Sequence, residues 1–299
     1  MRKEKGVVGL LVMVTFCGCG TSDPVVVEGT NSGSEMPSPA DVVGQPSSRT
    51  TIDTPSVVKE VGKEWGSLSG TFIYDGEPPQ RKNLSITQDM ELCGQYEVLD
   101  ESLVVNQENG GLANAIVFLY QKRAGVSLPI HPSYDATAIA KIPLDNVKCR
   151  FDPHVQVLRT SQTLVVGNLD SVGHNTKIDT FNNPPINPMS PAGSTLEYRF
   201  TEAELRPVTV SCSIHPWMSA WVFFRNDPYF VVTDKNGCFE IKNLPVGDWQ
   251  FQVWHERGTI SDVTLDGQAC SWKRGRFTAT IKSGENDLGE IKVAPQLFE

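Results

Sequence analysis

The stretch Val208-Thr-Val-Ser-Cys212-Ser-Ile-His215-Pro-Trp-Met218 joins a strand pattern to three side chains that can bind a metal. Alternation over its first half places Val208, Val210 and Cys212 on one face of a strand. Because the two valines mark that face as the buried one, we expect the Cys212 thiol to point into a core. His215 and Met218 follow at intervals of three residues, in the loop after the strand.

A second histidine lies upstream, in Asn168-Leu-Asp-Ser-Val-Gly-His-Asn175, after an expected strand at 163–166. Copper that exchanges one electron needs ligands that tolerate both Cu(I) and Cu(II), and two imidazoles, one thiolate and one weak thioether meet that need. Asn175 is placed to hydrogen-bond across to the ligand loop and hold it. The sequence therefore predicts one type-1 copper site with the ligands His174, Cys212, His215 and Met218.

Other interpretations of these residues stay open. Cys212 could be half of a disulfide, with His215 and Met218 as packing residues. His154, at the start of an expected strand, and His255, at the end of another, are the alternative imidazoles. We interpret His154 as structural and His255 as a surface or packing residue.

Short apolar or alternating segments separated by turns recur along the chain from Trp65 onward. Gly (25) and Pro (20) are plentiful among the 299 residues, which suits many short strands joined by turns. This pattern is typical of a β-sandwich, so we expect an all-β protein. The net charge of −9, with no dense basic patch, argues against a nucleic-acid partner.

The segment around the metal-binding residues resembles the cupredoxins. Phe151-x-Pro153, two short strands, Asn168-x-Asp170 and His174-Asn175 are similar to the first half of a plastocyanin-type domain, and the C-x2-H-x2-M loop is similar to that of amicyanin. The resemblance implies a Greek-key β-sandwich with one blue copper, acting as a one-electron carrier rather than an enzyme. It covers roughly 149–227, and we place the copper module at 148–228.

A second resemblance covers the flanking segments. Thr233-Asp-Lys-Asn-Gly-Cys-Phe-Glu-Ile241 and Leu244-Pro-Val-Gly247 are similar to the carboxypeptidase regulatory-like domain, a small Ig- or transthyretin-like β-sandwich. Segments 64–147 fit the first half of such a domain and 229–296 the second half. The copper module is then inserted into this sandwich; the rival division has two consecutive domains meeting near Asp227.

The N-terminus has the features of a targeting segment. A basic start precedes the short apolar run Gly6 to Phe16, which is too short to span a bilayer. Phe16-Cys-Gly-Cys19 resembles a bacterial lipobox, which implies a signal peptide at 1–19 and a lipid on Cys19; a plain secretory signal is the alternative. Residues 20–63 are rich in Ser, Thr, Pro and Gly and predict a disordered tether.

The chain has seven cysteines. If Cys17 leaves with the signal and Cys19 carries lipid, five remain, which in an oxidising compartment favours two disulfides and one unpaired thiol. Connectivity does not follow from the sequence. With Cys212 reserved for metal, the pairs that stay within one part of the chain are Cys93–Cys149 and Cys238–Cys270.

Together these features predict an exported electron carrier on the periplasmic or cell-surface side, held at the membrane by its N-terminal lipid. His215 lies in a loop expected to be exposed, so we expect a redox partner to dock near His215 and Trp217. The alternatives are a protein that stores or delivers copper and a structural lipoprotein without a redox role. Repeated Met or His tracts, which would favour copper storage, are absent from the sequence.

Overall fold

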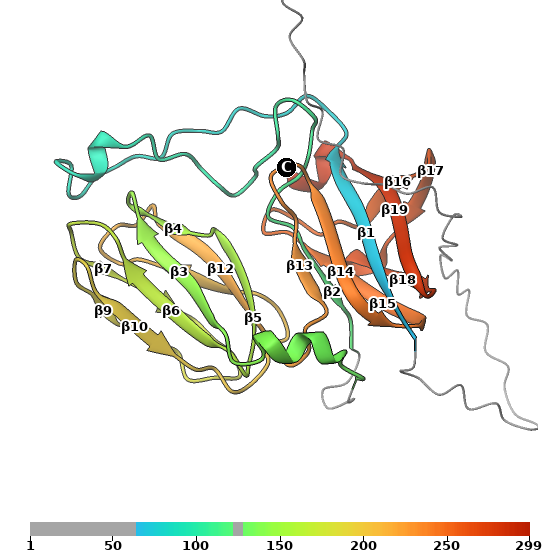
Figure 1. Cartoon of the computed structure of the whole chain (residues 1–299). Helices are drawn as coiled ribbons and strands as arrows, with labels where there is room; N and C mark the ends of the chain where they lie inside the picture. The colour runs from blue at the N-terminus through green and yellow to red at the C-terminus, as the bar shows by residue number, and fades with distance from the viewer. Residues whose placement is uncertain (1–63, 122–127) are drawn as a thin grey trace, which may run out of the picture.

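The computed structural model describes residues 64–121 and 128–299, and it is an all-β protein with two sandwiches side by side (Figure 1). The expected signal peptide at 1–19, lipidated Cys19 and tether at 20–63 lie outside the described residues. No helix in the described part of the chain is long and apolar enough to cross a membrane. Its helices are the 3-10 turns η1 (Cys93–Gln95), η2 (Pro132–Thr137), η3 (Lys273–Gly275) and η4 (Pro295–Phe298).

The first sandwich is built from both ends of the described chain. Its strands are β1 (Trp65–Tyr74), β2 (Ile116–Leu119), β13 (Phe230–Val232), β14 (Cys238–Pro245), β15 (Gly247–Trp254), β16 (Asp262–Leu265), β17 (Gln268–Ser271), β18 (Arg276–Ile281) and β19 (Gly284–Val293). One sheet has the order β14-β1-β19-β16-β17 and the other β13-β2-β15-β18. β1 and β2 therefore form sheets with strands that lie more than a hundred residues later.

The second sandwich occupies the chain between these two groups of strands. Its strands are β3 (Lys141–Val147), β4 (Arg150–Asp152), β5 (Val155–Arg159), β6 (Thr163–Asn168), β7 (His174–Asn175), β8 (Lys177–Ile178), β9 (Met189–Ser190), β10 (Thr195–Tyr198), β11 (Val208–Ser211) and β12 (Ser219–Arg225). Its two sheets have the orders β10-β6-β3-β4 and β5-β12-β11-β8, and β7 pairs with β9.

The second sandwich begins earlier than expected from the sequence. β3, which we assigned to the first half of the other sandwich at 64–147, runs parallel to β6, with Lys141 opposite Thr163 and Asn146 opposite Asn168. A strand belongs with the strands to which its backbone hydrogen-bonds, so the boundary lies near Lys141 rather than at 148.

Each sandwich has its own apolar core. The alternation in β1 buries Leu68 and Phe72 against the opposite sheet of the first sandwich. In the second sandwich Val208 and Val210 are buried as their alternation predicts. A third cluster joins the two sandwiches, where the Phe118 and Phe223 rings pack edge to face with centroids 5.0 Å apart. The sandwiches therefore contact each other through packed side chains as well as through the chain connections.

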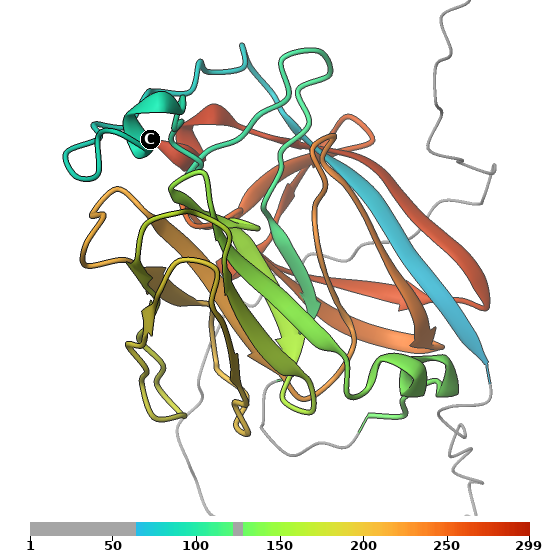
Figure 2. The ribbon, with the colours of Figure 1, turned by 60° about the vertical axis from the view of Figure 1, so that its left-hand side comes forward.

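A long connection leaves the first sandwich and reaches over the second (Figures 1 and 2). We call residues 75–111, between β1 and β2, the overhang. It contains η1, and a disulfide between Cys93 and Cys149 attaches it to the second sandwich, with Cα atoms 5.5 Å apart. The overhang therefore brings residues of the first sandwich's chain segment to the end of the second sandwich where β3 and β4 meet.

The second disulfide we considered, Cys238–Cys270, is not formed, and Cys270 carries a free thiol. Cys238 lies on β14 and Cys270 on β17, which are the two edge strands of the five-stranded sheet. Four strand spacings, roughly 19 Å, separate such positions, whereas a disulfide needs Cα atoms within about 7 Å. That prediction was wrong because sequence proximity said nothing about the strand order.

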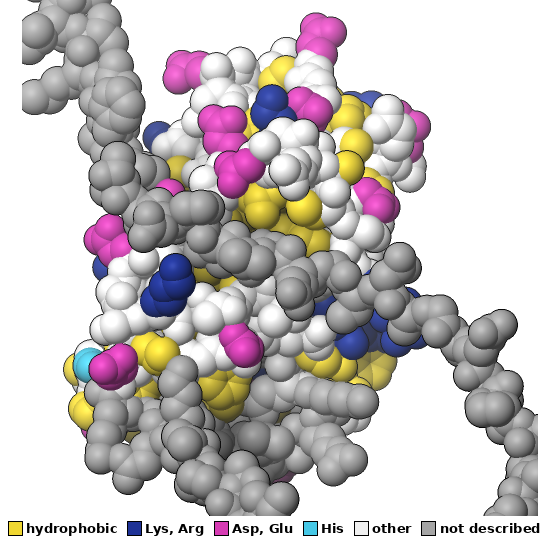
Figure 3. All heavy atoms as spheres, turned by 90° about the vertical axis from the view of Figure 1, so that its right-hand side faces the viewer, with side chains coloured by type: hydrophobic (Ala, Val, Ile, Leu, Met, Phe, Trp, Pro, Cys, Tyr) yellow, Lys and Arg dark blue, Asp and Glu magenta, His cyan; other side chains and the backbone are white. Residues whose placement is uncertain are grey.

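Figure 3 shows the outer face of the first sandwich, where acidic side chains lie scattered with hydrophobic patches between them.

Gly237 allows the tight turn that leads into β14 of this sandwich. Its φ is +80°, and a Cβ at this position would lie 2.2 Å from the Phe72 carbonyl oxygen. A side chain here would therefore be strained and would also clash with β1.

Candidate metal centre

The loop between β11 and β12 carries three of the four expected ligands. The two strands pair with Val210 opposite Ala220 and Ser211 opposite Ser219. Cys212 comes directly after β11, and its N–H donates to the Met218 carbonyl oxygen at 3.3 Å. Met218 N–H donates in turn to the His215 carbonyl oxygen at 2.9 Å. These two hydrogen bonds close the base of the loop and form a turn inside it, which fixes the direction of its side chains.

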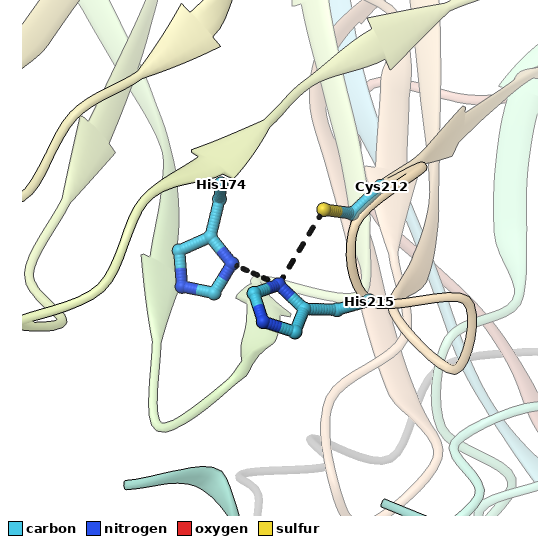
Figure 4. Close-up of side chains that lie close together, drawn as sticks. All are labelled: His174, Cys212 and His215. Atoms are coloured by element: carbon cyan, nitrogen blue, oxygen red, sulfur yellow. Dashed lines mark hydrogen bonds between the residues drawn. The ribbon is translucent and has the colours of Figure 1, made fainter. Parts of the chain in front are cut away.

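His174, Cys212 and His215 converge in the interior (Figure 4). Nδ1 of His174 lies 2.9 Å from Nδ1 of His215, and Cys212 Sγ lies 3.7 Å from His215 Nδ1. One ligand atom from each residue lies within 4.8 Å of the others. Both histidines are 0% exposed and Cys212 is 3% exposed. Met218 is buried beside them in the core of the same sandwich.

Asn175 holds the ligand loop against the strand that carries His174. Its Oδ1 accepts the N–H of Ser213 at 2.7 Å and that of Ile214 at 3.3 Å. Its own backbone N–H donates to Cys212 Sγ at 3.5 Å. The residue after His174 therefore orders both the loop backbone and the sulfur, which limits how far the ligands move.

Each of these two histidines has a carboxylate on its outer nitrogen. His174 Nε2 donates to Asp170 Oδ2 at 2.9 Å, and His215 Nε2 donates to Asp89 Oδ2 at 2.8 Å. Such contacts keep a proton on Nε2 and turn Nδ1 toward the centre, where a bound metal would take the place of any proton on Nδ1. Asp170 is buried and also accepts the N–H groups of Lys148 and Cys149, whereas the Asp89 side chain is 42% exposed.

The burial of His215 differs from what the sequence suggested. Ser213 and Pro216 of its loop are exposed as expected, but the His215 side chain is buried, and Asp89 from the overhang covers its outer nitrogen. Trp217 next to it remains half-buried, with its ring centroid 5.0 Å from that of His215. The burial of His215 could not be predicted, because Asp89 comes from a distant part of the chain.

The electrostatics of the cluster favour a thiolate. Burial by itself would raise the pKa of the Cys212 thiol, but hydrogen bonds from His174, from the Asn175 N–H and from His215 outweigh it and lower the pKa to about 6. Burial would likewise lower the pKa of His174, but Asp170 and Cys212 outweigh it and raise that pKa to about 9. Both shifts favour a Cys212 thiolate paired with a protonated His174 in the metal-free protein, and the thiolate is the form that binds metal.

These residues fit a copper ion. Two imidazole nitrogens and a thiolate face one another in a buried space with a methionine next to it, and this donor set resembles a type-1 copper site. The alternative imidazoles lie elsewhere. His154 contacts Glu256 through its Nε2, and His255 is buried with its Nδ1 accepting the Arg257 N–H at 3.2 Å.

Two acidic residues of the centre were not found from the sequence. The sequence did carry a signal for Asp170, since this residue precedes His174 by only four residues and lies in the same turn. Asp89 had none, because it lies 126 residues from His215. A carboxylate near a metal-binding histidine is a common outer contact, but only the path of the overhang shows which carboxylate it is.

No protein-family model matches this chain. No curated protein matches it either. Among solved structures, a copper(I) form of an amicyanin variant is 19% identical, with a TM-score of 0.26, over 28% of this chain and 82% of its own. A purple cupredoxin from Nitrosopumilus maritimus is 26% identical, with a TM-score of 0.24, over 28% of this chain and 98% of its own.

A copper-containing nitrite reductase from Thermus scotoductus SA-01 is 20% identical, with a TM-score of 0.26, over 35% of this chain and 25% of its own. All three likenesses are partial and have low TM-scores. What the centre can do is therefore inferred from its own residues.

Proposed function

We propose that this protein is a type-1 copper protein that carries single electrons. One observation supports the proposal above all others, the buried convergence of His174 Nδ1, His215 Nδ1 and Cys212 Sγ. When bound, copper would supply the chemistry by alternating between Cu(I) and Cu(II). Met218, next in the same loop, is the proposed weak fourth ligand.

The chain's own contribution is to keep the donor atoms in one arrangement. Asn175 ties the thiolate to the loop backbone, and Asp170 orients the His174 ring. Apolar side chains of the second sandwich surround Cys212 and Met218 and exclude water. A centre that does not rearrange between oxidation states exchanges electrons with little reorganisation, which suits a carrier.

We further propose that the protein is exported and anchored by a lipid on Cys19, so that it works at a membrane surface. Its redox partner would dock over Trp217, which is half-buried and lies next to the fully buried His215. The Trp217 ring then lies between the partner and the centre. Copper storage without electron transfer is the competing function.

Titration of the purified protein with Cu(II), followed by visible absorption, tests the proposal. We expect an intense thiolate-to-copper band at one equivalent of copper, and its complete loss in Cys212→Ala. Cys270→Ala is the matched control, because Cys270 has a free thiol outside the centre. A colourless protein, or a band that disappears equally in both variants, would rule out the proposal.

A further inference from the structure

The outer nitrogen of His215 is hydrogen-bonded to a residue from the chain segment of the first sandwich. Asp89 belongs to the overhang, which begins and ends in strands of the first sandwich. Its Oδ2 lies 2.8 Å from His215 Nε2, and His215 is 0% exposed. The metal-binding loop of the second sandwich is therefore completed by a group that this sandwich does not contain.

The backbone around Asp89 is shaped to present the carboxylate. Asp89 has a φ of +47°, in the left-handed region that a non-glycine residue seldom adopts. Its carbonyl oxygen accepts the N–H groups of Leu92 and Cys93 at 3.0 and 2.8 Å. Those hydrogen bonds form a tight turn that leads into η1, so the position of Cys93 determines where Asp89 lies.

Cys93 is in turn attached to the copper module by its disulfide with Cys149. Cys149 N–H donates to Asp170 Oδ2 at 2.9 Å, and its carbonyl oxygen accepts Trp217 Nε1–H at 3.0 Å. One end of the disulfide thus contacts the carboxylate behind His174, and the other leads to the carboxylate behind His215. The disulfide sets the two carboxylates relative to each other.

We infer that Asp89 is a positioning residue of the metal centre, so that the centre is assembled from both sandwiches. The inference rests on the proposed function. A carboxylate on Nε2 keeps the proton there, directs the Nδ1 lone pair toward the metal and makes that nitrogen a stronger donor. Its negative charge also stabilises Cu(II) relative to Cu(I), since the divalent ion carries more charge.

The first test compares reduction potentials of the copper-loaded protein and its variants. Asp89→Asn removes the charge and keeps a hydrogen-bond acceptor, and Asp89→Ala removes both. Glu91→Gln is the control, because it removes an equal charge from an exposed position of the same turn. In both Asp89 variants we expect the equilibrium between Cu(II) and Cu(I) to shift about tenfold toward Cu(I). For a one-electron couple this raises the reduction potential by about 59 mV.

We expect the visible band to survive in both Asp89 variants, since all four proposed ligands remain. A potential in Asp89→Asn and Asp89→Ala that moves no further than in Glu91→Gln overturns the inference while leaving the type-1 copper centre intact. A wild-type protein without the band instead overturns the proposed function.

A second readout needs no copper. In the metal-free protein we expect the His215 Nε2 proton to exchange slowly with solvent in nuclear magnetic resonance spectra, and at least tenfold faster in Asp89→Ala, because its acceptor and cover are lost. Glu91→Gln is expected to keep the slow exchange. Equal exchange rates in wild type and Asp89→Ala would show that Asp89 does not hold this ring.

Discussion

Each histidine of the centre donates a hydrogen bond to a carboxylate, but the two carboxylates lie at very different distances along the chain from the histidines they contact. His174 is held by Asp170, four residues away and 4% exposed at its side chain. His215 is held by Asp89, which is 126 residues away and 42% exposed. The first support forms within one turn of the second sandwich, whereas the second forms only when the overhang has folded across that sandwich.

This difference shows that the centre has an inner and an outer half. The Asp170 side carries buried hydrogen bonds whose loss leaves polar groups unsatisfied. The Asp89 side is close to solvent, which weakens its electrostatic contribution to stability. We therefore expect the two sides to differ in how they affect folding, and the following variants test that expectation.

The largest effect is expected from removing the disulfide that connects the two sides. Replacing Cys93 and Cys149 together by serine releases a loop whose ends are 56 residues apart. Chain-entropy arguments put the loss in free energy of unfolding at about 4 kcal/mol. Chemical denaturation measures it, and Cys270→Ser is the control. A loss no greater than in the control would mean that the overhang is held by other contacts.

Removing the inner carboxylate is expected to cost almost as much. Asp170→Ala leaves the N–H groups of Lys148 and Cys149 and the ring of His174 without their acceptor. We expect the metal-free protein to lose about 3 kcal/mol in its free energy of unfolding. Asp179→Ala, which removes an exposed ion pair with Lys177, is the control. Similar losses in the two variants would contradict the buried role of Asp170.

A third histidine shows what burial does when the ring's partner is not a carboxylate. Burial lowers the pKa of His255 from 6.5 to about 4, and its Nδ1 accepts the Arg257 N–H. Between these values the unfolded chain binds a proton that the folded protein does not, so stability falls as the pH drops from 6.5 to 4.

The pKa difference corresponds to roughly 3 kcal/mol of stability lost across that interval. Denaturation curves at successive pH values measure the loss, and His255→Gln is expected to remove this part of the pH dependence. An unchanged pH profile in the variant would show that other groups cause it. His174 differs because Asp170 and Cys212 raise its pKa to about 9 despite burial.

The smallest effect on folding is expected at the outer carboxylate. Asp89→Ala removes a partly exposed contact, so the free energy of unfolding of the metal-free protein should fall by less than about 1 kcal/mol. The same denaturation experiment that tests Asp170→Ala gives the comparison directly. A loss at Asp89 as large as that at Asp170 would erase the distinction between the inner and outer halves.

How much of the centre the sequence could predict follows from the same distances. Cys212, His215 and Met218 lie in one loop after an alternating strand, so their proximity is a local property of the chain. His174 required only that its strand lie next to that loop. The structure brings His174, Cys212 and His215 together as that pattern indicates. Asp89 could not be predicted, because turn residues in a 37-residue connection carry no signal of what they cover.

The fold shows a similar limit. An all-β protein followed from the turns and the alternation, and the structure confirms it. The pairing of β3 with β6 and the placement of Cys238 and Cys270 on opposite sheet edges did not follow. Strand order depends on contacts between distant segments, and alternation tells only which face of a strand is buried.

Voltammetry of the copper-loaded wild-type protein tests the central claim most directly. If His174, Cys212 and His215 hold copper for electron transfer, the protein gives a reversible one-electron wave whose two directions match in size over repeated cycles. Cys212→Ala, loaded in the same way, is expected to lose that wave. Copper that binds at one equivalent but gives an irreversible wave, or none, would contradict the account and favour a copper store.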